Sequence, residues 1–127
     1  GCSITKIFEK SEEYFRCLET EAVILASKLN SYVIATGGGV IKKSENIDQL
    51  KINGVIIFID KSPKDIIRDI DISTRPLLKN SIQNVYKLYE ERYVLYQQFC
   101  DIVIKENGKA EEIVEKIITS YNSMCEI

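Results

Sequence analysis

The fold class follows most directly from residues 33–40, which read VIATGGGV. A short β-branched run ends there in three consecutive glycines, Gly37, Gly38 and Gly39. Glycine is costly to order, so three in a row after a strand indicate that another group approaches the backbone where a Cβ would obstruct it. In α/β proteins such a place lies beyond the carboxyl end of a parallel strand, where ligands bind. A plain turn is the alternative interpretation.

Outward from this segment, apolar runs alternate with stretches of helical periodicity. Strands are expected over residues 32–36, 55–60 and 101–105. Helices are expected over residues 4–10, 12–29, 44–50, 63–70, 81–99 and 110–121, and residues 71–80 are polar and are expected to form a loop. This alternation predicts an α/β fold, a parallel sheet wound with helices, in a single domain over residues 1–127.

Local signals mark the helix ends. Ser3, Ser11 and Ser62 are predicted N-caps, and Pro63 suits the first position of a helix. Asp60 ends a predicted strand and is either an N-cap or a functional acid. Helical spacing places these apolar residues on the inward faces: Phe15, Leu18, Ala22, Leu25 and Leu29; Ile82, Val85, Leu88, Leu95 and Phe99; Ile113, Ile117 and Tyr121.

Composition excludes several classes of function. The chain has 127 residues and a net charge of −2, without the basic excess of a nucleic-acid-binding protein. No apolar run approaches the roughly 20 residues of a membrane helix. The four cysteines lack metal-ligand spacing and there is no histidine, so no metal site is expected, and the cysteines are read as buried, reduced thiols of a cytoplasmic protein.

The lack of histidine also excludes the common Ser-His-Asp and Cys-His mechanisms. Phosphoryl transfer stays compatible with this composition, because it needs positioning and charge stabilisation more than covalent chemistry from the protein. The chain contains no G-x-x-x-x-G-K-[ST] motif, the usual phosphate-binding loop.

Four arginines could bind an anion. Arg16 precedes Glu19 by three residues on a predicted helix, so it is either a surface ion pair or a guanidinium fork for a carboxylate. Arg92 lies beside acids on the long helix, where a solvated arginine is the plain alternative. Arg75 stands in the polar loop before a proline, which favours an exposed arm, and Arg68 ends a helix.

The order of these features resembles a known family. The residues that carry the resemblance are Ile7-Phe8, Glu12, Phe15-Arg16, Glu19, Ala35-Thr36-Gly37-Gly38-Gly39-Val40, Arg75-Pro76-Leu77-Leu78, and Arg92 with Leu95-Tyr96. In this order and spacing they resemble shikimate kinase, over residues 3–106. The resemblance implies a P-loop kinase-like, three-layer α/β/α fold and the transfer of a phosphoryl group from ATP to the 3-hydroxyl group of shikimate, in aromatic amino-acid biosynthesis.

The resemblance also implies roles for single residues at the substrate end. Arg16 and Arg92 match the two arginines that hold the shikimate carboxylate. Gly38 and Gly39 match the glycines whose backbone approaches the substrate ring. Gly37 belongs with them to a substrate-binding segment that replaces the more familiar second nucleotide-site motif. Phe8 and Phe15 match apolar walls of that pocket.

At the nucleotide end, Arg75 matches a catalytic arginine on a lid, residues 71–80, that closes over the phosphates. Arg68 matches an arginine packed against adenine, and Asn107 lies in a turn that falls near the adenine. The implied co-substrate is ATP with Mg²⁺, and the complete enzyme is expected to be a cytoplasmic monomer that binds neither nucleic acid nor membrane.

The resemblance further implies that two strands of the family, with the P-loop and a paired-aspartate motif, precede Gly1 and are not in this chain. We expect the chain alone to be inactive, to retain the shikimate pocket and lid, and to need the preceding segment or self-association to fold. Two other interpretations stay open: a small P-loop kinase of the gluconate kinase type, and a non-catalytic remnant that binds a small acid or a partner chain.

Overall fold

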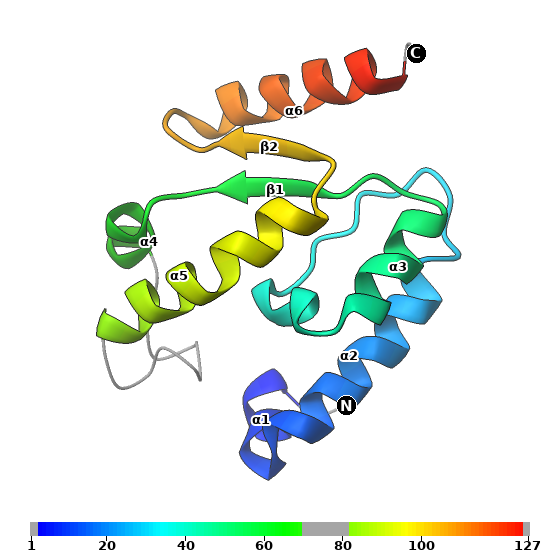
Figure 1. Ribbon diagram of the computed structural model, residues 1–127, viewed down its shortest axis with the longest axis vertical. Coiled ribbons are helices and arrows are strands. Elements are labelled where there is room, and N and C mark those ends of the chain that lie inside the picture. Colours follow the sequence, from blue (N-terminus) through cyan, green and yellow to red (C-terminus); the bar gives the residue numbers. More distant parts are fainter. Residues whose placement is uncertain (1–2, 70–81, 126–127) are drawn as a thin grey trace. The chain divides into compact units, whose positions relative to one another are not determined.

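The computed structural model describes residues 3–69 and 82–125 (Figure 1). Its elements are α1 (Ile4–Lys10), α2 (Glu12–Ala26), the 3-10 helix η1 (Gly38–Lys42), α3 (Ser44–Ile52), β1 (Ile57–Asp60), α4 (Pro63–Asp69), α5 (Ile82–Phe99), β2 (Ile102–Lys105) and α6 (Ala110–Cys125). The chain divides into two compact units, Gly1–Gly54 with Asp71–Asn84, and Val55–Ile70 with Val85–Ile127. The single domain stays a prediction.

In the first unit, α1 and α2 begin at serine caps, which confirms the prediction. The Ser3 Oγ accepts a hydrogen bond from the Lys6 backbone N–H at 3.2 Å, and the Ser11 Oγ accepts one from Tyr14 at 2.9 Å. Each cap satisfies a donor that the first turn of a helix leaves unpaired. Because Ser11 is extended, with φ −174°, the chain can turn between the two helices, which pack against each other.

The core of this unit forms where α2, η1 and α3 meet. Its buried apolar side chains are Val23, Val40, Ile41, Ile47 and Leu50. The buried Asn46 donates from Nδ2 to the Val40 carbonyl at 3.0 Å, which fixes the start of α3 to η1. This packing holds the glycine segment against α2.

The strand predicted over residues 32–36 is wrong. Within the described residues this segment forms no strand, and Val33 is 100% exposed. A strand is stabilised chiefly by the neighbours it packs and pairs with, and the sheet of the described chain contains only β1 and β2. β-branched composition alone therefore does not make this segment a strand.

In the second unit, β1 and β2 form a parallel pair in which Ile57 lies opposite Ile102. Ile56 extends the pairing: its carbonyl accepts from the N–H groups of Asp101 and Ile102 at 2.8 and 3.1 Å. The Ile56 N–H donates to the Asp101 carboxylate at 2.8 Å. The α/β class with parallel strands is confirmed. The ends of β1 and β2 lie within two residues of the predicted ends.

Helices cover this strand pair. The Phe58 ring lies 4.8 Å from the Tyr96 ring and 6.1 Å from the Tyr93 ring, both on α5, measured between centroids. α6 packs against β2, where Ile104 and Ile113 are buried. Figure 1 shows α5 and α6 on opposite sides of the strand pair. This unit therefore has the helix–sheet–helix layering that the sequence predicts.

Some inward faces were predicted wrongly. Leu25 is 68% exposed, and Ala22, Leu29, Ile82 and Tyr121 are exposed as well. α2 ends at Ala26 instead of near residue 29, and it buries Arg16 and Val23. The prediction for α2 is wrong because it assumed that only apolar residues face inward, whereas the inward face of this helix carries the charged Arg16.

The prediction of buried cysteines is also wrong for two of them. Cys17 on α2 and Cys125 at the end of α6 are exposed. Their exposure means that neither thiol contributes to a core, although cysteine usually behaves as a small buried apolar residue.

Candidate active site

The first compact unit brings Arg16 against the glycine segment. The Arg16 residue is only 8% exposed, although its side chain is charged. Its Nη1 donates to Glu19 Oε1 at 2.9 Å, and its Nη2 lies 3.5 Å from Glu12 Oε1. Side chains three or four residues apart share one side of a helix, which is why both acids reach Arg16. The ion pair proposed as the plain alternative is therefore present, but it is buried.

Close approach to a glycine is observed at Gly39. A Cβ there would collide with the Arg16 guanidinium group, whereas a Cβ at Gly37 would lie at an ordinary 3.6 Å from Glu19 Oε2. No glycine of the described chain has a positive φ, so Gly39 is required for space and not for an unusual backbone conformation. Gly37 precedes η1, and Gly38 and Gly39 are its first two residues, so the plain turn is not what forms.

The aromatic walls are described only in part. The Arg16 Cζ lies 5.0 Å from the centroid of the Phe15 ring, within the range of a cation–π contact. The side chain of Phe8 lies outside the described part of the structure, so its role stays a prediction.

Lys42 completes a chain of charges. The Lys42 Nζ donates to Glu12 Oε1 at 2.6 Å, which links the last residue of η1 to the first residue of α2. This hydrogen bond from Lys42, together with the nearby charges of Lys42 and Arg16, holds the pKa of Glu12 below its ordinary value despite partial burial. Sequence reasoning missed this role: the four-residue spacing from Glu12 to Arg16 was an available signal, but Lys42 gave none.

Arg92 lies in the second unit, on α5. Its side chain is half-buried, and its Nε and Nη2 are enclosed without a hydrogen-bond partner in the described chain. Buried donors that lack a partner are costly, and a guanidinium group binds carboxylates and phosphates best. The unpaired nitrogens of Arg92 are therefore suited to an anionic ligand.

The interaction between Asp60 and Tyr89 was not predicted. Tyr89 donates from its hydroxyl to Asp60 Oδ1 at 3.0 Å, at the carboxyl end of β1. Desolvation, with this bond and the charge of Asp60, raises the pKa of Tyr89 to about 12. Asp60 is thus a hydrogen-bond acceptor, while Ser62 caps α4 by accepting from the Asp65 N–H at 3.2 Å. Nothing in the spacing of Tyr89 could have indicated this contact.

Two of the residues predicted to contact the nucleotide, Arg68 and Asn107, lie in the second unit. There Lys61 pairs with their chain neighbours, Asp69 at 2.6 Å and Glu106 at 3.6 Å. Arg68 lies exposed in the last turn of α4 and pairs with Asp65 at 3.0 Å. The Asn107 Oδ1 accepts from Lys116 Nζ at 3.3 Å. Arg75 and the rest of the predicted lid lie outside the described residues.

The predicted site residues are divided between the two units. Arg16 and the three glycines belong to the first unit, whereas Arg92, Arg68 and Asn107 belong to the second. The convergence of Arg16 and Arg92 on one carboxylate therefore stays a prediction.

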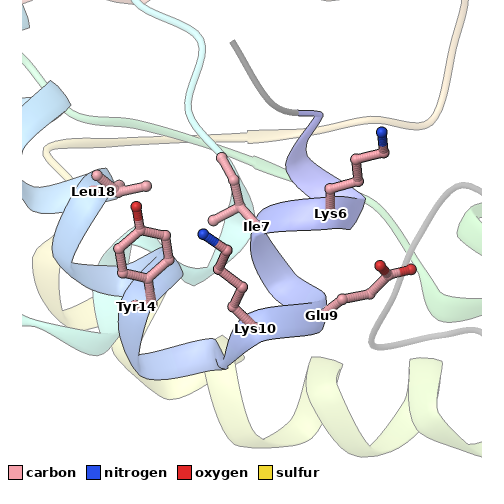
Figure 2. A pocket seen from close by; sticks show the side chains of 6 residues that line it. All are labelled: Lys6, Ile7, Glu9, Lys10, Tyr14 and Leu18. Carbon is pink, nitrogen blue, oxygen red and sulfur yellow. The ribbon is translucent and has the colours of Figure 1, made fainter.

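A separate pocket of about 540 Å³ opens between α1 and α2 (Figure 2). It is lined by Lys6, Ile7, Glu9, Lys10, Tyr14 and Leu18. Figure 2 shows Lys10 reaching toward Tyr14, and its Nζ lies 5.3 Å from the ring centroid. The charged side chains around this pocket are exposed, and none of the described side chains that line it belongs to a predicted site residue.

Two further features are absent from residues 3–69 and 82–125. No three side chains of His, Cys, Asp or Glu lie close enough there to hold a metal ion together. Within the same ranges, none of the helices has both the length and the apolar character to cross a membrane.

Comparisons with known proteins converge on one family. A family model described as shikimate kinase matches residues 1–122. The chain is 46% identical over 115 residues to the shikimate kinase of Clostridium botulinum (strain Alaska E43 / Type E3), covering 91% of this chain and 70% of that one. It is also 46% identical over 126 residues to the shikimate kinase of Caldanaerobacter subterraneus subsp. tengcongensis, covering 95% and 73%.

Solved structures show the same similarity. Shikimate kinase from Acinetobacter baumannii in complex with shikimate matches with a TM-score of 0.90 and 29% identity, over 97% of this chain and 72% of that one. Shikimate kinase from Aquifex aeolicus matches with a TM-score of 0.80 and 32% identity, over 98% and 73%.

Proposed function

The chain belongs to the shikimate kinase family, a family of ATP-dependent kinases, and we propose that it transfers the γ-phosphoryl group of ATP to the 3-hydroxyl group of shikimate. The observation that supports this most is the buried guanidinium group of Arg16 beside Gly39. The planar fork of a guanidinium group matches a carboxylate, and shikimate is a carboxylic acid.

At the substrate end, Arg16 would bind the carboxylate, Gly39 leaves room for the Arg16 guanidinium group, and Gly38 would leave room for the ring beside the main chain. Phe15 and Phe8 would supply apolar walls. Glu12 and Glu19 hold Arg16 before substrate arrives, so little side-chain entropy is lost on binding. Positioning of the acceptor hydroxyl is the main contribution that such a site makes to phosphoryl transfer.

Arg92 would be the second cation for the same carboxylate. Its buried Nε and Nη2 have no hydrogen-bond partner in the described chain, so an anion would supply bonds that they lack. This role requires the two compact units to place Arg92 beside Arg16.

At the phosphate end, Arg75 would stabilise the charge of the transferring group, and Arg68 and Asn107 would contact the adenine. The 3-hydroxyl oxygen loses its proton and forms a bond to the γ-phosphorus as the bond to the leaving oxygen of ADP breaks, so the products are the phosphate ester, ADP and a proton. Mg²⁺ supplies neutralisation of phosphate charge in such reactions. The described residues contain no acidic cluster to hold it, so they contribute no step through the metal.

We also propose a cytoplasmic, monomeric enzyme whose partners are small molecules. A net charge of −2 gives no general affinity for the phosphate backbone of a nucleic acid.

The direct test is ATP- and shikimate-dependent release of ADP by the full-length protein encoded by the gene. Gluconate in place of shikimate is the control, because it is also a hydroxy acid but differs in shape. We expect turnover with shikimate alone. A folded protein that phosphorylates gluconate as well as shikimate, or neither of them, would contradict the proposed function.

A further inference from the structure

Four charged side chains of the first unit form one continuous chain of ion pairs: Lys42 to Glu12, Glu12 to Arg16 and Arg16 to Glu19. The distances between paired atoms are 2.6, 3.5 and 2.9 Å in that order. Two of these side chains are positive and two are negative, so their charges sum to zero. Arg16 is thus engaged by two carboxylates and would have to attract a third one, that of the substrate.

We infer that Lys42 is a charge-compensating residue, which neutralises Glu12 so that the positive charge of Arg16 stays available to the substrate carboxylate. The inference rests on the proposed function, because it assumes that a carboxylate binds at Arg16. Lys42 would act through Glu12 and need not touch the substrate. Its effect on the substrate would therefore be electrostatic and indirect.

The geometry favours this role over that of an ordinary surface ion pair. Glu12 Oε1 is shared between Lys42 Nζ and Arg16 Nη2, so the charge of Lys42 acts on the same oxygen that engages Arg16. Arg16 is buried, so its interactions are screened less than those between surface charges. The low pKa of Glu12 agrees with a carboxylate that stays ionised beside two cations.

Without Lys42, the three remaining side chains would carry a net charge of −1 beside the site of an anion. The side chains of Lys42 and Glu12 are 44% and 39% exposed, so solvent weakens the effect. Like charges at a binding site oppose association, and a partly exposed charge changes affinity by roughly three- to tenfold.

The test measures shikimate binding by calorimetry and steady-state kinetics on the full-length protein. Lys42→Met removes the charge and keeps the length of the side chain, whereas Lys42→Arg keeps the charge. Lys42→Met/Glu12→Gln removes both charges and restores neutrality. Lys43→Met is the matched control, because it removes the same charge one residue further along the chain.

We expect Lys42→Met to raise the Kd and KM for shikimate about three- to tenfold with kcat changed less than about twofold. The defect should shrink as salt is added, because repulsion between charges is screened. Lys42→Arg should return to within about twofold of the wild-type Kd. The double variant should recover most of the loss, because the excess negative charge is gone while its amide oxygen can still accept a hydrogen bond from Arg16. A purely structural role predicts the opposite for the double variant, which would be as defective as Lys42→Met.

The inference is overturned if Lys42→Met binds shikimate as Lys43→Met does, or if the double variant shows no rescue. Circular dichroism on each variant at the assay temperature separates loss of folding from loss of binding. Failure of the wild-type protein to bind shikimate would instead refute the proposed function, and the inference with it.

Discussion

Two helices carry the arginines of the predicted carboxylate site, and they hold them differently. On α2, Arg16 is engaged by Glu12 and Glu19. On α5, Arg92 has two buried nitrogens without a hydrogen-bond partner in the described chain. A guanidinium group that is paired with carboxylates is held in one geometry. A buried guanidinium group with unpaired nitrogens can still bind an anion, but it lowers the stability of the protein. Arg16 is therefore suited to orienting a substrate, and Arg92 to gaining affinity from it.

Replacing Arg16 should have the largest effect on both stability and binding. Arg16→Ala leaves the Glu19 carboxylate, whose side chain is only 12% exposed, without its cation. We expect a loss of roughly 2–4 kcal/mol in the free energy of unfolding and a loss of about 100-fold or more in shikimate affinity. Urea unfolding and calorimetry measure the two effects. Arg16→Lys is the control that keeps the charge but not the fork, and an Arg16→Ala protein as stable as wild type would show that the pair is not holding α2.

Replacing Arg92 should separate the two effects. Arg92→Met removes a half-buried charge with unpaired nitrogens and keeps much of the apolar stem. We expect shikimate affinity to fall by about 10- to 100-fold while the free energy of unfolding is unchanged or rises by about 1 kcal/mol. The same two measurements apply. If Arg92→Met destabilises the protein as strongly as Arg16→Ala does, the contrast between the two arginines is wrong.

The glycines test whether the space beside Arg16 matters. Gly39→Ala places a methyl group where the Arg16 guanidinium group lies, whereas Gly37→Ala places one at 3.6 Å from Glu19 Oε2. We expect KM for shikimate to rise about tenfold for Gly39→Ala and to stay within about twofold for Gly37→Ala, since a displaced binding group costs about that much. Equal KM values for the two variants would mean that Arg16 moves aside freely.

The smallest effect is expected on α5, at Tyr89. Tyr89→Phe removes the hydrogen bond to Asp60 and should cost about 1 kcal/mol of unfolding free energy at neutral pH. The pKa of Tyr89 is raised from 10.0 to about 12, so folding favours the protonated phenol. Its contribution is complete below pH 10 and is lost as pH rises toward 12.

Urea unfolding between pH 9 and 12 tests this sign. Wild-type stability should fall more steeply with pH than that of Tyr89→Phe, because only the wild type has this phenol. Tyr86→Phe, on the same helix but exposed, is the control for the other tyrosines. Parallel pH profiles for wild type and Tyr89→Phe would contradict a protected phenol.

Much of the local structure could be predicted from the sequence, because its causes are local. The caps at Ser3, Ser11 and Ser62 form as predicted, since each depends on an N–H only three residues away. β1 follows from a continuous apolar run. The segment over residues 32–36 has similar composition but lacks a pairing neighbour in the described chain, and no local pattern reveals whether a neighbour is present.

The sequence predicted the type of candidate site, but not which side chains contact one another in it. The glycines indicated close approach, but not that Arg16 is the group that approaches Gly39. Apolar spacing on α2 selected residues such as Leu25 as inward, whereas the helix buries Arg16. Burial of a charge depends on partners such as Lys42, which are distant in the sequence and which only the folded chain brings together.

Two hydrogen bonds join Ile56 and Asp101 just before the parallel strands β1 and β2 begin, and one of them is accepted by the Asp101 side chain. A slip of one residue would break them and would turn Phe58 away from α5, so they help to fix the register. The Ile56 amide, bonded to a carboxylate, should exchange with deuterated solvent whenever that side chain rotates away. The Ile102 amide, bonded to a backbone carbonyl, should exchange only when the strands part. The ratio of the two exchange rates thus distinguishes a moving side chain from an opening sheet.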